Sequence, residues 1–473
     1  MKKFCITLSI LLASSIMAHA QYISEVLEYK PAPGQQTNSS PWGVPQAAKS
    51  LVGTVTGSMS LGAFGGYVIF KFGKPVENNP DNPFGVDFTV FGNPLVNWSE
   101  PGVVWVMKDE NGNGLPDDTW YELAGSDYYF SSTIKNYEVT YTNLKQSIAA
   151  NVPWSDNRGK TGFVSANSFH TQPYYPLADS FPSVGTENYT LKGTFIAGAV
   201  DSTANTNIKS YKRAFGYADN LFRGSAPYTV PDNPYTLQKE NSGGDALDID
   251  WAVDANGNYI NLDKIDFVKV QNGMLANGSW LGEVSTEVTG AVAVTPDKSI
   301  TGVEDMIVIK DVPKQIDTSK YQLEVFVFHK GRLQPGKTIN WSTNVAEAAV
   351  DANNVLTLTK TSDVIVTATL AENANISAII TSKVVVKEIT TAIPSQSAKP
   401  YIRLYPNPAT EYIKIGGVSE VAVSIFNISG KMIFSHEQYA EGQTINISDW
   451  AKGIYILQIK GKTSVSFLKF TKK

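Results

Sequence analysis

The chain has 473 residues, a formal net charge of −5, 18% charged residues and 42% hydrophobic residues. At roughly 100 to 200 residues per domain, this length predicts about two to four domains. The composition excludes a disordered chain and provides no broad cationic face for sequence-independent nucleic-acid binding. With one cysteine, Cys5, and four histidines, a disulfide scaffold and a cysteine-based zinc site are excluded as well.

Residues 1–20 have the features of a secretory signal peptide. A basic start at Met1-Lys2-Lys3 precedes an apolar stretch, and Ala18-His19-Ala20 is a small-x-small cleavage site before Gln21. The alternative, an uncleaved membrane anchor, needs about 20 apolar residues, and no later segment is long enough to span a bilayer either. We therefore expect cleavage after Ala20 and a mature chain with neither cysteine nor a transmembrane segment.

Residues 21–292 are expected to form an all-β body. Short runs rich in β-branched and aromatic residues, such as Gly66–Phe72 and Val103–Met107, are bounded by Gly, Pro, Asn and Asp. They predict the strands of a β-sandwich or jelly roll. Val44–Leu51 is the best candidate for a short helix.

One segment of this body follows the first part of an EF-hand-type calcium loop. Such a loop places side-chain oxygens at relative positions 1, 3, 5 and 9, a Gly at position 6 and a backbone carbonyl at position 7. The matching residues are Asp109, Asn111, Asn113, Asp117, Gly114 and the carbonyl of Leu115. Trp120 replaces the usual Glu at position 12, so Asp118 or Glu122 would have to complete the ligand shell. The pattern predicts bound calcium, with a plain Asn/Gly-rich turn as the alternative.

A second acidic cluster occupies residues 245–258. On a strand, Asp248 and Asp250 would lie on the same side. Two neighbouring carboxylates need a cation, a proton or a base to coexist. We expect either a second metal site or a solvent-facing strand that is followed by an Asx turn.

Aromatic residues in Pro- and Asn-rich loops indicate ligand binding. The candidates are Tyr174, Tyr175, Tyr228 and Tyr235, with His170 close by in the sequence. Exposed rings of this kind suit sugars or a large planar cofactor, whereas buried rings would only fill gaps between loops and sheet.

Sequence signatures of enzymes are mostly absent. The chain has no HExxH, Walker A or GxSxG motif, and His170 is the only histidine in the body, which leaves a Ser-His-Asp or multi-His site without partners. Hydrolysis by paired carboxylates is the remaining catalytic alternative. A binding protein is therefore predicted ahead of an enzyme.

Residues 293–389 contain about seven short strands in roughly 100 residues, which is typical of an immunoglobulin-like sandwich. The segment from Trp341 to Val355 resembles bacterial Ig-like domains, in which a strand-central Trp packs in the core. This resemblance implies a spacer or docking module.

The C-terminal part divides into a linker and a small domain. Residues 390–400 are small, polar and proline-punctuated, as in an extended linker. Residues 401–473 resemble the type IX secretion sorting domain of Bacteroidetes through the motifs Leu404–Ala409, Val423–Lys431 and Gly453–Leu457 and a basic end. The resemblance implies recognition by the type IX secretion machinery, transport across the outer membrane, removal of this domain, and release or surface attachment. The alternative is a small β-sandwich without a sorting role.

The body also resembles a poorly characterised family of Bacteroidetes cell-surface proteins of the PKD or cell-surface type. The matching motifs are Lys30–Gln35, Leu61–Gly66, Ser99–Gly102, Asn111–Ser126, Phe169–Pro176, Asp248–Asp254 and Trp280–Val288. The resemblance implies a surface protein that works beside TonB-dependent transporters, including those for cobalamin, and it assigns no ligand-binding residues.

Together these features predict a secreted, surface-located, calcium-stabilised protein. It would capture a cobalamin-type cofactor or a glycan for an outer-membrane importer. The alternatives are a carbohydrate-active enzyme that uses paired carboxylates and a protein-binding adhesin.

Overall fold

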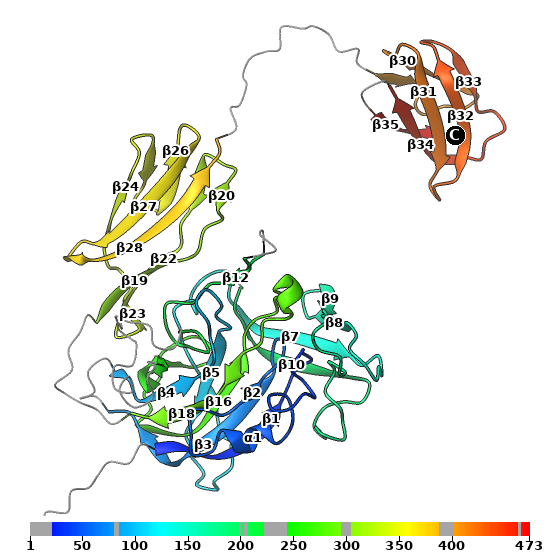
Figure 1. Ribbon diagram of the computed structural model, residues 1–473. Helices are drawn as coiled ribbons and strands as arrows, with labels where there is room; N and C mark the ends of the chain where they lie inside the picture. Colours follow the sequence, from blue (N-terminus) through cyan, green and yellow to red (C-terminus); the bar gives the residue numbers. More distant parts are fainter. Residues whose placement is uncertain are drawn as a thin grey trace, which may run out of the picture. The chain divides into compact units, whose positions relative to one another are not determined.

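The computed structural model describes residues 21–79, 85–197, 200–202, 207–221, 244–294, 304–386, 402–461 and 465–473. They belong to two compact units, residues 1–387 and 388–473, and nearly all of their regular structure is β-strand (Figure 1). The predicted all-β fold class is confirmed. The predicted signal peptide, Tyr228, Tyr235 and the predicted linker lie outside the described residues. In the described part of the chain, no helix has the length and apolar character needed to cross a membrane.

The body is built around one long sheet that curls at β1. The order is β14-β4-β18-β1-β3-β16-β5-β6-β15, with β13 paired to β5. The bounds are β1 (Gln21–Lys30), β3 (Tyr67–Glu77), β4 (Phe88–Phe91), β5 (Gly102–Met107), β6 (Tyr121–Leu123), β13 (Tyr217–Ala218), β14 (Asp245–Leu247), β15 (Ala252–Val253), β16 (Lys264–Asn272) and β18 (Gly290–Ala293).

Strand β1 belongs to both halves of this sheet. Gln21 and Tyr22 pair with β18, and the residues from Ile23 onward pair with β3. The register shifts twice along the β1–β3 pair, and such bulges bend a strand enough for it to pass from one sheet layer to the next. Residues of both halves, including Ile23, Phe70 and Phe88, form one buried core between them.

Smaller elements complete the body. A four-stranded sheet has the order β10-β7-β8-β9, and β11–β12 and β17–β2 form two-stranded pairs. The bounds are β2 (Met59–Ser60), β7 (Ile134–Thr142), β8 (Val152–Asp156), β9 (Thr161–Val164), β10 (Asn188–Phe195), β11 (Val200–Asp201), β12 (Lys209–Ser210), β17 (Glu287–Val288), α1 (Ala47–Ser50), η2 (Ile249–Trp251) and η3 (Ser279–Leu281). The helix α1 lies within the segment where a short helix is expected.

The strands after residue 304 form an Ig-like sandwich. Its three sheets have the orders β19-β22-β23, β20-β28-β27-β24 and β21-β26-β25. The bounds are β19 (Asp305–Ile309), β20 (Gln315–Ile316), β21 (Lys320–Gln322), β22 (Val325–His329), β23 (Arg332–Leu333), β24 (Ile339–Thr343), β25 (Ala348–Val350), β26 (Val355–Leu358), β27 (Ser362–Leu370) and β28 (Asn373–Val384). Trp341 packs against two of its core clusters, as the resemblance to bacterial Ig-like domains implies.

This Ig-like region is joined to the body by buried contacts. Val308 and Phe328 belong to the same apolar core as the body's strands. The turn between β22 and β23 lies against Trp251, whose indole N–H donates to the carbonyl of Lys330 at 2.7 Å. Gly331 in this turn has φ +74°, and a Cβ at this position would lie 2.3 Å from Trp251 Nε1, so only glycine fits.

The sorting domain is a separate small sandwich. Its sheets have the orders β29-β30-β33 and β32-β31-β34-β35. The bounds are β29 (Arg403–Tyr405), β30 (Tyr412–Gly416), β31 (Val421–Asn427), β32 (Met432–Tyr439), β33 (Thr444–Asn446), β34 (Gly453–Lys460) and β35 (Val465–Lys472). Its core contains Ile413, Val423, Leu457 and Phe470, and all of the residues in this core cluster come from this domain.

Candidate functional site

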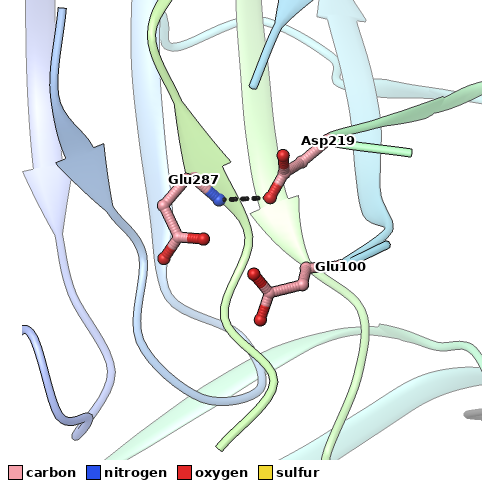
Figure 2. A group of neighbouring side chains, drawn as sticks. All are labelled: Glu100, Asp219 and Glu287. Carbon is pink, nitrogen blue, oxygen red and sulfur yellow. Dashed lines mark hydrogen bonds between the residues drawn. The ribbon is translucent and has the colours of Figure 1, made fainter. Parts of the chain in front are cut away.

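Three buried carboxyl groups meet in the body. Glu100 directly precedes the segment that leads into β5, Asp219 follows β13, and Glu287 begins β17. Figure 2 shows their side chains facing one another, and oxygen atoms of all three lie within 4.8 Å of each other. No local sequence pattern indicates this group, because its members come from distant parts of the chain.

Backbone hydrogen bonds fix the three residues in place. The Asp219 carboxylate accepts from the backbone N–H groups of Asn93 and Glu287, both at 2.8 Å. Glu100 donates its own N–H to the Asp219 carbonyl at 3.0 Å and accepts from the N–H of Ser285 at 2.9 Å. The segments around residues 93, 100, 219 and 285 therefore form one rigid frame around the carboxyl groups.

Burial makes the charged forms of these carboxyl groups unfavourable. Burial and, to a smaller extent, the neighbouring Asp219 charge raise the pKa of Glu100 to about 8. Burial likewise raises the pKa of Asp219 and of Glu287 well above the usual range. Glu283 is also buried with a pKa raised to about 8, and its Oε2 has no hydrogen-bond partner in the described part of the chain.

No salt bridge within the described residues links this group to a lysine or arginine. Carboxyl oxygens of Glu100 and Glu287 lie within 4.8 Å of each other. Carboxyl groups at this distance cannot all be ionised, so they must share protons or hold a cation. The oxygen-only ligand set is of the kind that a hard divalent cation takes.

Glu100 and Glu287 line a cavity of about 600 Å³. Its walls combine ring faces and aliphatic side chains with amide groups: Trp42, Trp98, Leu95, Val96, Ile208, Leu281, Gln35, Gln36, Asn93, Asn97 and Asn207. Small-molecule sites typically have about 300–1,000 Å³ and a few convergent polar groups among apolar walls. We call this feature the acidic cavity.

The structure corrects the expected exposure of Tyr174 and Tyr175. Tyr174 and Tyr175 are only 1% and 6% exposed and pack in the second core of the body, together with Phe64 and Tyr141. The reason is that the small sheet β10-β7-β8-β9 has an apolar face that these loop residues cover. His170 is half-buried, and its burial lowers its pKa. Exposed rings are instead provided by Phe169 and Trp280, whose centroids are 6.2 Å apart.

The predicted calcium loop gathers its side-chain oxygens around its own backbone. Asp109 accepts from the N–H groups of Asn113 and Gly114, at 3.1 and 2.8 Å. Asn111 and Asn113 each donate a side-chain N–H to Asp117, and Asn113 Oδ1 accepts from the N–H of Leu115.

The two residues expected to complete the calcium shell are placed differently. Asp118 lies at the loop, because it accepts from the N–H of Glu110 at 2.9 Å. Glu122 lies elsewhere, because its carboxylate accepts from Thr194 Oγ1 at 2.5 Å and from Lys135 Nζ at 3.4 Å. Of these two residues, only Asp118 lies at the loop.

The strand expected at Asp248 and Asp250 is a 3₁₀ turn. Asp248 caps η2 and accepts from the Asp250 N–H at 2.7 Å, so the two carboxylates do not alternate along a strand. Asp87 accepts from the N–H of Ile249 at 2.9 Å. Burial raises the pKa of Asp87 to about 7 and that of Asp248 well above its usual range. Asp248 and Asp250 line a cavity of about 450 Å³ that also includes His329 and Arg332.

Comparison with known proteins identifies the C-terminal domain. Residues 403–473 match the family model of the secretion system C-terminal sorting domain. The chain is accordingly a secreted or cell-surface protein of the type IX pathway of Bacteroidetes, and this domain implies interaction with the secretion machinery. A search of curated proteins found no match.

Solved structures resemble the chain only weakly. A chimeric titin Z1Z2 has 13% identity and a TM-score of 0.15, with 36% of this chain and 97% of that chain covered. Domains 3–5 of Drosophila OTK have 11% identity and a TM-score of 0.18, with 46% and 82% covered. PorZ of Porphyromonas gingivalis, described as an essential surface component of the type IX secretion system, has 11% identity and a TM-score of 0.15, with 86% and 43% covered. TM-scores of this size support no conclusion about this chain.

Proposed function

We propose that this protein binds a small polar ligand in the acidic cavity at the cell surface and holds it for an outer-membrane importer. The observation that carries the proposal is the cavity itself, in which Trp42 and Trp98 stand beside the carboxyl groups of Glu100 and Glu287. The two ligand classes to which the sequence points, glycans and cobalamin-type cofactors, are the first to test.

The lining of the cavity suits a sugar. A sugar ring has an apolar C–H face that packs on aromatic rings, and hydroxyl groups that both donate and accept hydrogen bonds. A protonated Glu100 can donate to a hydroxyl oxygen, and the amides of Gln35, Asn93 and Asn97 offer further donors and acceptors.

Calorimetric titration with cobalamin and a panel of soluble neutral glycans tests this function. Stacking on an aromatic ring contributes about 0.5–1.5 kcal/mol beyond its buried area, so Trp98→Ala should weaken binding several-fold or more. Glu287→Gln should weaken it as well. Trp280→Ala is the matched control, because Trp280 is half exposed but does not line the cavity. An absence of heat with every ligand would contradict the proposal and favour the adhesin.

A carbohydrate-active enzyme is the second candidate, because Glu100 has the raised pKa of a general acid. The geometry favours it less. The carboxyl groups of retaining glycosidases stand about 5 Å apart with the scissile bond between them, whereas Glu100 and Glu287 are buried together with a third carboxyl group, that of Asp219. Catalysis would be established if the protein released a shortened glycan and the Glu100→Gln variant did not.

We also propose that the loop at residues 109–118 binds calcium. Five side chains of the loop carry oxygen atoms: Asp109, Asn111, Asn113, Asp117 and Asp118. The hydrogen bond that Asp109 accepts from the Gly114 N–H supports the sharp turn that such loops require. Saturating calcium should stabilise the fold by about 2.7 kcal/mol at a hundredfold excess over Kd. Asp109→Ala should abolish this gain. Asp254→Ala is the control, because Asp254 holds a comparable exposed turn through Asn256 and Asn258. A melting temperature that does not respond to calcium or to a chelator would refute the site.

A further inference from the structure

Another cavity, of about 560 Å³, lies over strands β16, β5 and β6. Lys269 of β16 pairs directly with Trp105 of β5, which in turn pairs with Glu122 of β6. Directly opposed residues of antiparallel strands point to the same face, so these three side chains form one row. Trp120, Tyr121 and Tyr128 add aromatic surface to the lining. We call this feature the lysine–tryptophan cavity.

The ammonium group of Lys269 lacks a conventional partner. Its Nζ lies 4.8 Å from the ring centroid of Trp105 and 5.4 Å from that of Trp120. Across the described ranges it takes part in no salt bridge or side-chain hydrogen bond. Cation–π contacts and the charges of Glu122 and Glu28 offset part of the cost of burying the ammonium group, but no described side chain accepts a hydrogen bond from it. Burial lowers the pKa of Lys269 to about 8, which reflects this incomplete compensation.

A second donor in the same cavity is also unsatisfied. Trp105 Nε1 is buried and has no acceptor within the described residues. A buried donor without an acceptor is costly, so native sites usually supply one from water or a ligand. Trp105 and Lys269 are neighbours in the row, and a single acceptor group could serve both.

The carboxylates of the cavity are already engaged. Glu122 accepts from Lys135 and Thr194, and Asp254 accepts from the backbone N–H groups of Asn256 and Asn258. Lys192 is paired with Glu138 at 3.4 Å. Lys269 interacts with Glu122 and Glu28 only through their charges, so it is the cation of the cavity that has no hydrogen-bonded carboxylate partner among the described residues.

We propose that the lysine–tryptophan cavity binds an acidic sugar, with its anionic group between Lys269 Nζ and the Trp105 N–H and its ring against the aromatic lining. A carboxylate or a sulfate provides the required acceptors. The ring is accommodated because the cavity volume falls within the range of small-molecule sites. This site is separate from the acidic cavity, and its failure would leave the function proposed for that cavity untouched.

The test is calorimetric titration of the full mature chain with galacturonate oligomers, their methyl esters and chondroitin sulfate oligomers. The acidic oligomers should bind at least tenfold more tightly than the uncharged esters. Tight binding of the sulfated but not the carboxylated oligomers would assign the anion as sulfate and support the site. Equal affinity for acid and ester, or binding of none of the acidic oligomers, would overturn it.

Variants locate the binding. Lys269→Met should reduce the affinity for the acidic oligomers at least tenfold, and Lys269→Arg should retain most of it. Lys264→Met, on the same strand but outside the lining, is the matched control. Trp120→Ala, in the connection before β6, provides a second test if Lys269→Met fails to fold, and it should weaken the same ligands several-fold. Unchanged affinity in a folded Lys269→Met or Trp120→Ala variant would refute the proposal, whereas Trp98→Ala should leave this binding intact.

Discussion

The Ig-like region and the sorting domain are both small β-sandwiches, but they are attached to the chain in different ways. The Ig-like region contributes Val308 and Phe328 to the core of the body, and it belongs to the same compact unit. The sorting domain keeps a core of its own and forms a separate unit. Fold class therefore does not decide whether a sandwich is an independent module. What decides it is whether its apolar residues complete a neighbour's core.

The largest expected effect comes from removing the separable unit. A chain that ends at Lys399 should accumulate in the periplasm, because the sorting domain is the part that the secretion machinery recognises. Its ligand binding and the melting temperature of the remaining unit should be unchanged, since no core is interrupted. Cell fractionation and calorimetry measure both. Normal surface delivery of the shortened chain would contradict the assignment.

Two matched core substitutions should show how the Ig-like region and the sorting domain differ in their attachment to the body. Phe328 and Phe470 are both fully buried, and a buried Phe→Ala change costs about 3–5 kcal/mol. Phe328→Ala should lower the melting transition that the body and the Ig-like region share. Phe470→Ala should lower only the transition of the sorting domain. A Phe328→Ala variant whose body melts unchanged would show that the Ig-like region folds on its own.

The two units should also differ in how their stability depends on pH. Burial raises the pKa of Glu100 and of Glu283 to about 8, against 4.5 for an ordinary Glu. Between these values the folded state binds more protons than the unfolded state, so the free energy of unfolding should fall as pH rises from about 4.5 to about 8. The stability that the protons contribute is fully present below this window.

Calorimetry across that pH range measures whether the free energy of unfolding falls or rises with pH. Glu283→Gln should flatten the slope of the larger unit, because it replaces a carboxyl group that needs a proton. The transition of the sorting domain should lack this slope, since none of its described carboxylates is buried. A stability that rises with pH over this window would contradict the raised pKa values.

The smallest effect concerns a single hydrogen bond across the shared core. Trp251→Phe removes the bond from the indole N–H to the Lys330 carbonyl, and the loss should be about 1–2 kcal/mol. Hydrogen exchange should quicken in the turn between β22 and β23. Trp341→Phe, which removes a bond to Asn354 inside the Ig-like sandwich, is the control and should leave this turn protected.

Local patterns were sufficient to predict much of the fold. Alternating β-branched and aromatic residues predicted β3 and β5, and the motif around Pro406 and Pro408 predicted the sorting domain. The strand expected at Asp248 is wrong because its side chain caps the following turn, and a local hydrogen bond of this kind competes with strand pairing. The attachment of Phe328 to the body could not be predicted, because the identity of an apolar strand residue does not indicate which core it packs in.

The candidate sites also divide into those formed by neighbouring residues and those formed by residues distant in sequence. The calcium loop is local, so its spacing was visible in the sequence. Glu100, Asp219 and Glu287 come from distant parts of the chain and meet only because β13 pairs with β5 and the segment at 285–287 crosses beside them. Motifs around Glu100 and Glu287 were visible, but nothing in them indicated that the two residues meet. Tyr174 and Tyr175 show the opposite error, because proline-rich loops also bury rings when a sheet face needs cover.

The curled sheet has a consequence for folding. Gln21 in β1 pairs with Ala293 in β18, so the first strand of the body cannot find one of its partners until almost the entire body has been synthesised. Pairing over such a distance in sequence is slow, because the entropy of closing the intervening chain is lost before the contact forms. The body can therefore complete its sheet only late in synthesis, once residues 290–293 are available.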